Sequence, residues 1–205
     1  MIENILIIDT ETTGLEPRKG AKIIEIGAVL YNIKHRSVLQ QFSTLLPCET
    51  NPVEHINRIK PETTRLNYPF VGVKLKKEEI EEVWNNPEAQ ESVLYDEKVS
   101  LNAILTEMAN SADACVAHNA EFDKKFVAQL PCGTALLSKP WICTKANFTW
   151  PGNLSRFRLE DICNAMRVPY VNAHRALTDC LLLSQCFDNV HDLEHRFSRH
   201  NGVLM

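Results

Sequence analysis

Three apolar, β-rich runs fill the N-terminal part of the chain, and their order constrains the fold more than any other feature. They cover residues 4–9, 22–31 and 37–47. A turn-like stretch rich in Gly, Pro and charge follows the first run at 14–20, and only residues 32–36 separate the second run from the third. Short connections of this kind join antiparallel strands, whereas parallel strands need a long crossover. We therefore expect the chain to open with an antiparallel meander.

Helix and strand patterns alternate in the second half of the chain. Before them, residues 51–62 indicate a loop that leads into a short helix. The patterns then predict helices over 98–110, 119–130, 154–168 and 174–197, with a break near Asp188, and strands over 112–118 and within 136–144. Helices that alternate with strands connect parallel pairs, so the order predicts an α/β fold with a mixed sheet.

The length and composition indicate a single domain over residues 1–205. Apolar residues make up 44% of the chain and charged residues 23%, which is ordinary for a globular protein with a buried core. Residues 70–97 are charged and helix-prone, and we interpret them as an insertion. The C-terminal tail from about residue 195 is expected to be flexible.

Charge and cysteine content restrict the class of protein. The formal net charge is −4, so a polyanionic partner would need a local basic patch or metal ions. The 7 cysteines include no CxxC pair, which favours reduced core thiols, a cytoplasmic setting and no structural zinc. No apolar stretch reaches the ~18 residues that a membrane span needs, so no membrane partner is expected.

Two carboxylates follow the first apolar run in "IDTETTG", where Asp9 and Glu11 stand one residue apart. Alternate residues of a strand point to the same side, so these acids would repel each other unless a cation lay between them. His118 ends another expected strand. Because the carboxyl ends of parallel strands meet at one edge of a sheet, we expect a functional site at that edge.

Two later segments carry further acids. In "HNAEFD", Asn119 and Asp123 are four residues apart and would share one helix face. In "HRALTD", His174 and Asp179 are five residues apart, which is a rotation of about 140° on a helix. His174 is therefore expected on a loop before the helix, with Asp179 in the first turns.

The resulting set of candidates is suited to hydrolysis. It comprises Asp9, Glu11, Asp123 and Asp179, with His174 beside them. Ligands that offer only oxygen suit Mg²⁺ or Mn²⁺ rather than zinc. Two such ions about 3.5–4 Å apart stabilise the attacking and leaving oxygens in phosphodiester cleavage. A histidine with an ordinary pKa of about 6.5 can accept a proton from water near neutral pH.

These motifs resemble those of the DEDDh branch of the DnaQ-like 3′→5′ exonuclease superfamily. The first motif stands here as "DTETTG", the second as "HNAEFD" and the third as "HRALTD", in the order and approximate spacing of the family. The resemblance covers about 1–62 and 112–187. It implies a ribonuclease H-like α/β fold, whose mixed central sheet combines an antiparallel meander with parallel strands and is flanked by helices. It also implies two divalent ions, Mg²⁺ or Mn²⁺, and a nucleic-acid partner with a free 3′ end.

The resemblance also implies roles for individual residues. Asp9, Glu11 and Asp179 would hold the metal ions, Asp123 would hold the second ion directly or through water, and His174 would be the general base. The residues expected to line the terminal-nucleotide pocket are Thr10, Thr12, Gly14 and Leu15, with Leu15 able to wedge against a base. Asn119 and Phe122 would support the site by hydrogen bonding and packing.

The chain departs from the family after its third expected strand. Many members have His-Gly-Ile there, whereas this chain has "INRI", which leaves Asn57 as the candidate contact to the terminal nucleotide and places Arg58 beside it. Two alternatives remain open at this point. The chain could be a degenerate nuclease fold that only binds nucleic acid or acts as a scaffold, or an exoribonuclease for short oligoribonucleotides. A homodimer or a partner protein also remains open.

Overall fold

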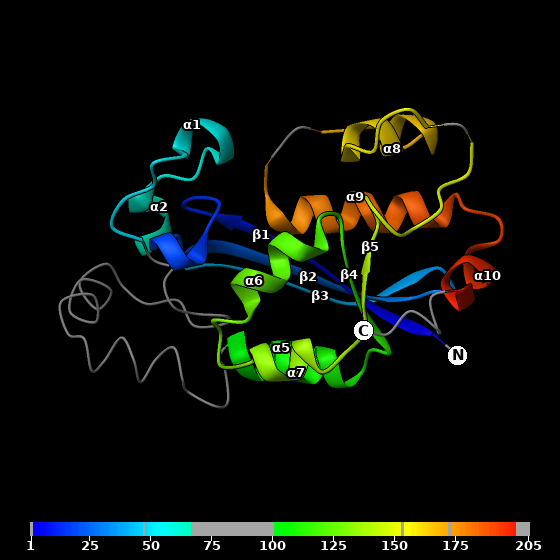
Figure 1. Ribbon diagram of the computed structural model, residues 1–205, viewed down its shortest axis with the longest axis horizontal. Helices are drawn as coiled ribbons and strands as arrows, with labels where there is room; N and C mark the ends of the chain where they lie inside the picture. The colour runs from blue at the N-terminus through cyan, green and yellow to red at the C-terminus, as the bar shows by residue number, and fades with distance from the viewer. Residues whose placement is uncertain (1, 47, 67–100, 153, 172–173, 200–205) are drawn as a thin grey trace.

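A mixed sheet forms the centre of the fold in the computed structural model (Figure 1). The structure describes residues 2–46, 48–66, 101–152, 154–171 and 174–199. The sheet is 5-stranded in the order β3-β2-β1-β4-β5. Its strands are β1 (Asn4–Thr12), β2 (Ile23–Asn32), β3 (Ser37–Leu45), β4 (Ala114–Ala117) and β5 (Trp141–Cys143).

Strand direction divides the sheet into two parts. β1 pairs antiparallel with β2, and β2 pairs antiparallel with β3, as a hairpin meander requires. On the other side, β1 pairs parallel with β4, and β4 pairs parallel with β5. The expected opening meander and mixed sheet are therefore confirmed, and β1 lies at the boundary between the two directions.

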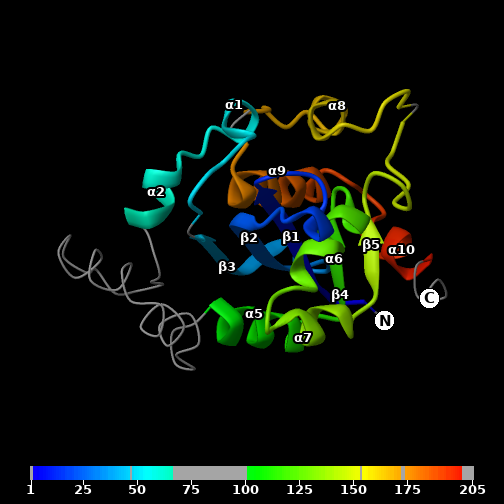
Figure 2. The ribbon, with the colours of Figure 1, turned by 60° about the vertical axis from the view of Figure 1, so that its left-hand side comes forward.

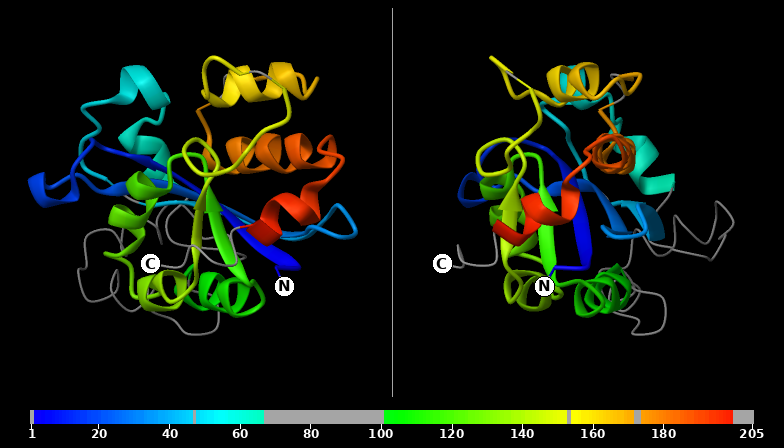
Figure 3. Two further views of the ribbon diagram at one scale, coloured as in Figure 1. Left: turned by 45° about the vertical axis from the view of Figure 1, so that its right-hand side comes forward. Right: turned by 90° about the vertical axis from the view of Figure 1, so that its right-hand side faces the viewer.

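Helices cover both faces of the sheet (Figure 2). On one face α9 (Ala176–Asp188) crosses β1 and β2, with α8 (Leu159–Ala165) on its outer side and α10 (Leu193–Ser198) following it (Figure 3). On the other face lie α5 (Leu101–Asn110), α6 (Ala120–Val127) and α7 (Gly133–Leu137). Two short helices, α1 (Glu54–Asn57) and α2 (Pro61–Leu66), follow β3.

Alternation along β1 produces a separate core on each face. Ile5 and Ile7 point toward α8 and α9, where they join one hydrophobic cluster. Leu6 and Ile8 point the other way and pack with residues of α5, α6 and α7. Because both faces are covered, β1 reads as a continuous apolar run that ends where the carboxylates begin.

Several predicted elements are confirmed with changed boundaries. The expected helix over 174–197 breaks after Asp188 and continues as α10, and the strand within 136–144 is β5. The helix expected over 154–168 is shorter and begins at Leu159, because Asp161 accepts a hydrogen bond from the Arg158 backbone N–H and caps it there. α7 was not predicted from the sequence.

The two segments expected to depart from the domain core have different outcomes. The interpreted insertion at 70–97 lies outside the described residues. The segment expected to form a flexible tail from about residue 195 begins within α10, where Phe197 is fully buried in the core.

The cysteines are buried and occupy core positions, as expected. Among the described helices, none combines the length and apolar character needed to cross a membrane.

Candidate active site

Asp9 and Glu11 lie on the same face of β1, toward α9. Their partners across the antiparallel ladder are Gly27 and Glu25 of β2, respectively, and residues directly opposite each other share a face. The face beside α9 therefore carries a row of acids next to a glycine. Strand alternation brings Asp9 and Glu11 together, as the sequence predicts.

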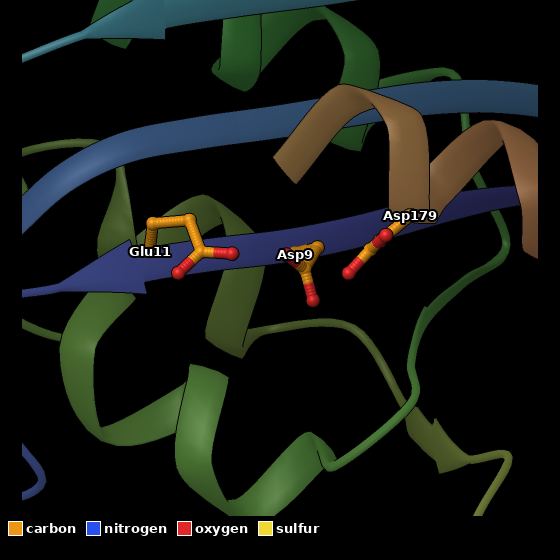
Figure 4. Close-up of side chains that lie close together, drawn as sticks. All are labelled: Asp9, Glu11 and Asp179. Atoms are coloured by element: carbon orange, nitrogen blue, oxygen red, sulfur yellow. The ribbon is translucent and has the colours of Figure 1, made fainter. Parts of the chain in front are cut away.

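Asp179 completes a carboxylate cluster from the first turns of α9 (Figure 4). One oxygen each from Asp9, Glu11 and Asp179 lies within 4.8 Å of the others. Asp179 is far from Asp9 and Glu11 in the sequence. It meets them because α9 crosses the sheet over β1 and β2. The three carboxylates are all half-buried.

Burial and mutual repulsion raise the pKa values of this cluster. Burial, and then the nearby Asp179 carboxylate, raise the pKa of Glu11 to about 8, while Arg175 opposes the shift. Burial likewise raises the pKa of Asp179 to about 6. The pKa of Asp9 also lies well above its ordinary value, first because of burial and then because of Asp123. A bound cation would relieve this repulsion.

Asp123 lies beside this cluster but faces a different partner. It is only 3% exposed, and its Oδ1 accepts a hydrogen bond of 2.8 Å from the Thr10 hydroxyl. Thr10 points away from the face that carries Asp9, toward α6, because neighbouring strand residues alternate. Burial raises the pKa of Asp123 to about 7, although the bond from Thr10 opposes the shift. Asp123 is not among the carboxylates that meet within 4.8 Å.

His174 lies on the loop before α9, as expected from its spacing to Asp179. Its backbone has a φ of 45°, a left-handed conformation that is uncommon for a residue other than glycine. The side chain is half-buried. Within the described residues its ring accepts or donates no hydrogen bond.

His118 is a site residue that the sequence reading placed at a strand end but gave no role. It lines a narrow cavity together with Asp9 and Asp179. Its Nδ1 lies 3.0 Å from the Thr144 hydroxyl. Burial lowers the pKa of His118 to about 4, so the ring is neutral at pH 7. The motif "HNAEFD" contains this residue, but its place in one cavity with Asp9 and Asp179 depends on the fold.

Glu25 and Arg175 are a second feature that the sequence reading missed. Glu25 is 1% exposed, and its carboxylate accepts hydrogen bonds from Arg175 at 2.7, 2.9 and 3.0 Å. In the sequence Glu25 looks like an ordinary charge within a β-rich run. Only the pairing of β2 with β1 places this ion pair at the edge of the carboxylate cluster.

The residues expected to line the terminal-nucleotide pocket follow the carboxylates. Thr12 is buried, and its hydroxyl donates a 2.7 Å hydrogen bond to the Gly14 carbonyl, which shapes the turn after β1. The next residue, Leu15, is 77% exposed. A large apolar side chain this exposed, so soon after Glu11 in the chain, is available to contact a ligand.

Asn57 forms internal bonds instead of facing solvent. It is 1% exposed, its Nδ2 donates to the Thr12 carbonyl at 3.1 Å, and its Oδ1 accepts from Asn51 at 2.8 Å. These bonds dock α1 on the end of β1 and occupy the amide within the protein. The exposed neighbour Arg58 has a φ of 58°, the left-handed conformation that favours glycine.

Asn119 and Phe122 lie at the start of α6. Asn119 is the residue before the first turn but makes no side-chain cap bond, and it is exposed. Phe122 packs against Phe126 with ring centroids 4.9 Å apart, which supports the packing role expected for it. The hydrogen-bonding role expected for Asn119 stays a prediction.

The donor set fits a hard divalent cation. Asp9, Glu11 and Asp179 offer only oxygen, their oxygens are close enough to share one ion, and burial and their mutual repulsion raise their pKa values. Cys180 is the nearest thiol in sequence, but it is buried in the core and donates to the Gly27 carbonyl. The site therefore offers the oxygen ligands that a divalent metal ion needs.

Solved structures share this fold. Exonuclease X in complex with 5′-overhanging duplex DNA has a TM-score of 0.51 and 23% identity, and the match covers 90% of each chain. The nuclease domain of 3′hExo, a DEDDh family member bound to rAMP, has a TM-score of 0.55 and 16% identity, covering 100% of this chain and 96% of that one. Exonuclease I has a TM-score of 0.61 and 14% identity, covering 97% of this chain and 44% of that one.

The sequence itself matches a family. No curated protein matches the chain. The family model RNase_T, described as exonuclease, matches residues 6–187, a span that runs from β1 to the end of α9 and includes every carboxylate of the site. The expected resemblance is thereby confirmed, and the chain belongs to this exonuclease family of the DnaQ-like superfamily, with a ribonuclease H-like fold.

Proposed function

We propose that the chain is a DEDDh-type, metal-dependent 3′→5′ exonuclease that releases nucleoside 5′-monophosphates from nucleic acid. The observation that carries the proposal is the convergence of Asp9, Glu11 and Asp179 within 4.8 Å, in a chain of the exonuclease family. Solved structures with this fold include one in complex with duplex DNA and one bound to rAMP, which supports nucleic acid as the substrate class.

The proposed roles follow from the chemistry of each side chain. Asp9, Glu11 and Asp179 hold a divalent ion, and Asp123, beside them on α6, serves a second one. Bound Mg²⁺ or Mn²⁺ would supply charge stabilisation for the attacking and leaving oxygens. His174 accepts a proton from the attacking water. The water oxygen then bonds to phosphorus as the bond to the 3′ oxygen of the preceding nucleotide breaks, and that oxygen leaves as an alkoxide that takes a proton from water.

The turn after β1 supports contact with the terminal nucleotide of the substrate. Leu15 is exposed and available to stack against a terminal base, whereas Asn57 is occupied by bonds to Asn51 and Thr12. We therefore assign terminal-nucleotide contact to the Thr12–Leu15 turn, and to Asn57 only the support of that turn.

A gel series tests the proposal. Single-stranded DNA, duplex DNA with recessed or overhanging 3′ ends, and RNA each carry a 5′ label and are incubated with Mg²⁺, Mn²⁺ or EDTA. We expect a descending ladder that requires metal. His174→Ala should lower kcat by about 100- to 10,000-fold, because the proton acceptor is lost, and Asp9→Ala should remove activity while the fold is kept.

The matched control is Asp192→Asn, which changes a carboxylate in the turn between α9 and α10 and should leave the ladder unchanged. If Asp9→Ala cleaves as fast as the wild type, the site is wrongly assigned. Intact substrates in every metal lane would favour a fold that binds nucleic acid without cutting it. A ladder confined to short RNA would instead favour an oligoribonuclease.

A further inference from the structure

Glu25 is a buried carboxylate that the proposed chemistry does not use. Both of its oxygens are occupied by the segment that leads into α9: Arg175 donates to Oε1 at 2.7 and 2.9 Å and to Oε2 at 3.0 Å, and the Ala176 backbone N–H donates to Oε2 at 3.1 Å. One strand residue therefore holds two consecutive residues directly after His174.

General stability is a poor explanation for this arrangement. Taking a carboxylate and a guanidinium out of water costs about as much free energy as their attraction returns, so buried ion pairs contribute little net stability. The Arg175 side chain is itself half-exposed, while Glu25 is almost fully buried. What the bidentate geometry does provide is a fixed orientation for the backbone that carries Arg175.

α9 is attached to the sheet without Glu25. A Cβ at Gly27 would lie 2.4 Å from the backbone of Ala176 and Leu177, so helix and strand touch backbone to backbone there. The Cys180 thiol donates to the Gly27 carbonyl at 3.5 Å. At the opposite end of α9, the Arg36 guanidinium donates to the carbonyls of the last turn. Asp179 is therefore placed by several independent contacts.

The residue His174 has no comparable support. It lies outside α9, its φ of 45° is unfavourable for a side chain with a Cβ, and its ring makes no hydrogen bond within the described part of the chain. The turn at His174 is thus constrained from its C-terminal side by the bonds of Arg175 and Ala176 to Glu25.

We infer that Glu25 is a positioning residue that fixes the turn at His174, through Arg175 and the Ala176 N–H, so that the imidazole is presented to the attacking water. The inference rests on the proposed function, since it assigns Glu25 a role in the proton transfer by His174. It assigns no role to Glu25 as a metal ligand.

The test is a double-mutant cycle with Glu25→Gln and His174→Ala. Glu25→Gln keeps the shape and one acceptor but loses the charge that holds Arg175. We expect kcat to fall about 10- to 100-fold with KM unchanged, as for other residues that orient a catalytic group. In the His174→Ala background, the same substitution should lower kcat by less than about twofold, because no imidazole is left to position.

Arg36→Gln is the matched control, because it loosens the same helix at its other end. Both variants should lower the melting temperature, but only Glu25→Gln should lower kcat. If Glu25→Gln does not fold, Arg175→Lys replaces it, since lysine keeps the charge but cannot make the bidentate pair.

The outcomes separate the inference from the proposed function. Equal losses from Glu25→Gln in both backgrounds, equal kcat losses from Glu25→Gln and Arg36→Gln, or an unchanged kcat in Glu25→Gln would each overturn the inference while the exonuclease assignment stands. A wild-type protein that releases no nucleotide, or a fully active His174→Ala variant, would overturn the proposed function and the inference with it.

Discussion

Asp9, Glu11 and Asp179 repel one another in the metal-free protein, because their oxygens lie within 4.8 Å and little water surrounds them. The pKa of Glu11 rises from its ordinary 4.5 to about 8, and that of Asp179 rises from 3.8 to about 6. The folded chain therefore holds protons that the unfolded chain has already released over this range of pH. A bound cation would reduce this repulsion and favour the ionised carboxylates.

This difference in proton binding predicts a pH-dependent stability. Between the ordinary pKa of Glu11, 4.5, and its folded value of about 8, the folded state binds more protons than the unfolded state, so the free energy of unfolding falls as pH rises. For protein treated with EDTA, the site should lower the melting temperature progressively from pH 4.5 to pH 8. Added Mg²⁺ should raise the melting temperature more at pH 8 than at pH 5.

A control variant tests whether this pH dependence of the melting temperature arises from the carboxylate cluster. Glu11→Gln removes the titrating group, so its melting temperature should depend less on pH and respond less to Mg²⁺. If the wild type and Glu11→Gln show the same pH dependence and the same response to Mg²⁺, the raised pKa values do not arise from this cluster.

Single residues were predictable where a local rule decides their direction. The period of two along a strand is enough to place Asp9 and Glu11 on one face, and the 140° rotation is enough to put His174 before α9. Glu25 was not predictable in this way. Its partner Arg175 is 150 positions away, and no local pattern reports a contact that depends on how α9 lies over β2.

At the scale of elements, the contact between α9 and β2 decides where Asp179 lies. Gly27 is opposite Asp9 in the ladder, and α9 passes over it with Ala176 and Leu177 in backbone contact. A side chain on residue 27 would hold the helix away from the strand. The separation between the Asp9 and Asp179 carboxylates therefore depends on a residue that carries no functional group.

Gly27→Ala tests this dependence. The added Cβ would lie 2.4 Å from backbone atoms that cannot rotate away, so α9 must shift. We expect a loss of about 3 kcal/mol in the free energy of unfolding, at the upper end for overpacking a core. Nuclease activity should fall further than the folded fraction alone explains.

Gly20→Ala provides the comparison in a denaturant titration of both variants. Gly20 has a φ of 88° and no atom within 4 Å of an added Cβ, so only backbone strain of about 1 kcal/mol is expected and activity per folded molecule should be unchanged. Equal activity per folded molecule in the two variants would contradict the role given to the helix contact.

Elements were predictable to the extent that their own residues determine them. The three opening strands and the parallel pair follow from apolar periodicity and connection length. The start of α8 depends on a cap between Arg158 and Asp161, and the run from 154 has apolar spacing that suggests helix before that point. α7 spans only Gly133–Leu137, which is too short for a periodic signal.

At the scale of the whole molecule, an aromatic cluster joins the C-terminal helix to the domain core. Phe148, Trp150, Phe187 and Phe197 pack with ring centroids 4.8–5.5 Å apart. This cluster connects the loop after β5 with α9 and α10. The region from about residue 195, expected to be a flexible tail, thus contributes a large side chain to the same core that underlies Asp179.

Phe197→Ala should therefore destabilise the whole domain. Removing a fully buried ring leaves a cavity among packed aromatic side chains, and we expect a loss of about 3–5 kcal/mol in a urea titration. Glu194→Ala, on the exposed side of the same helix, should change the stability by less than about 0.5 kcal/mol. A Phe197→Ala variant as stable as Glu194→Ala would show that α10 does not belong to the cooperative core.

The attachment of α9 to the first hairpin has a consequence for how activity arises during synthesis. The bonds that fix the two ends of this helix join residues 150 and 151 positions apart, and Tyr31 reaches Asp188 over a separation of 157. A nascent chain can present Asp9 and Glu11 long before Arg175 leaves the ribosome. The three carboxylates come together only when the third motif has been translated and docked, so an incomplete chain has no assembled site with which to cleave a phosphodiester bond.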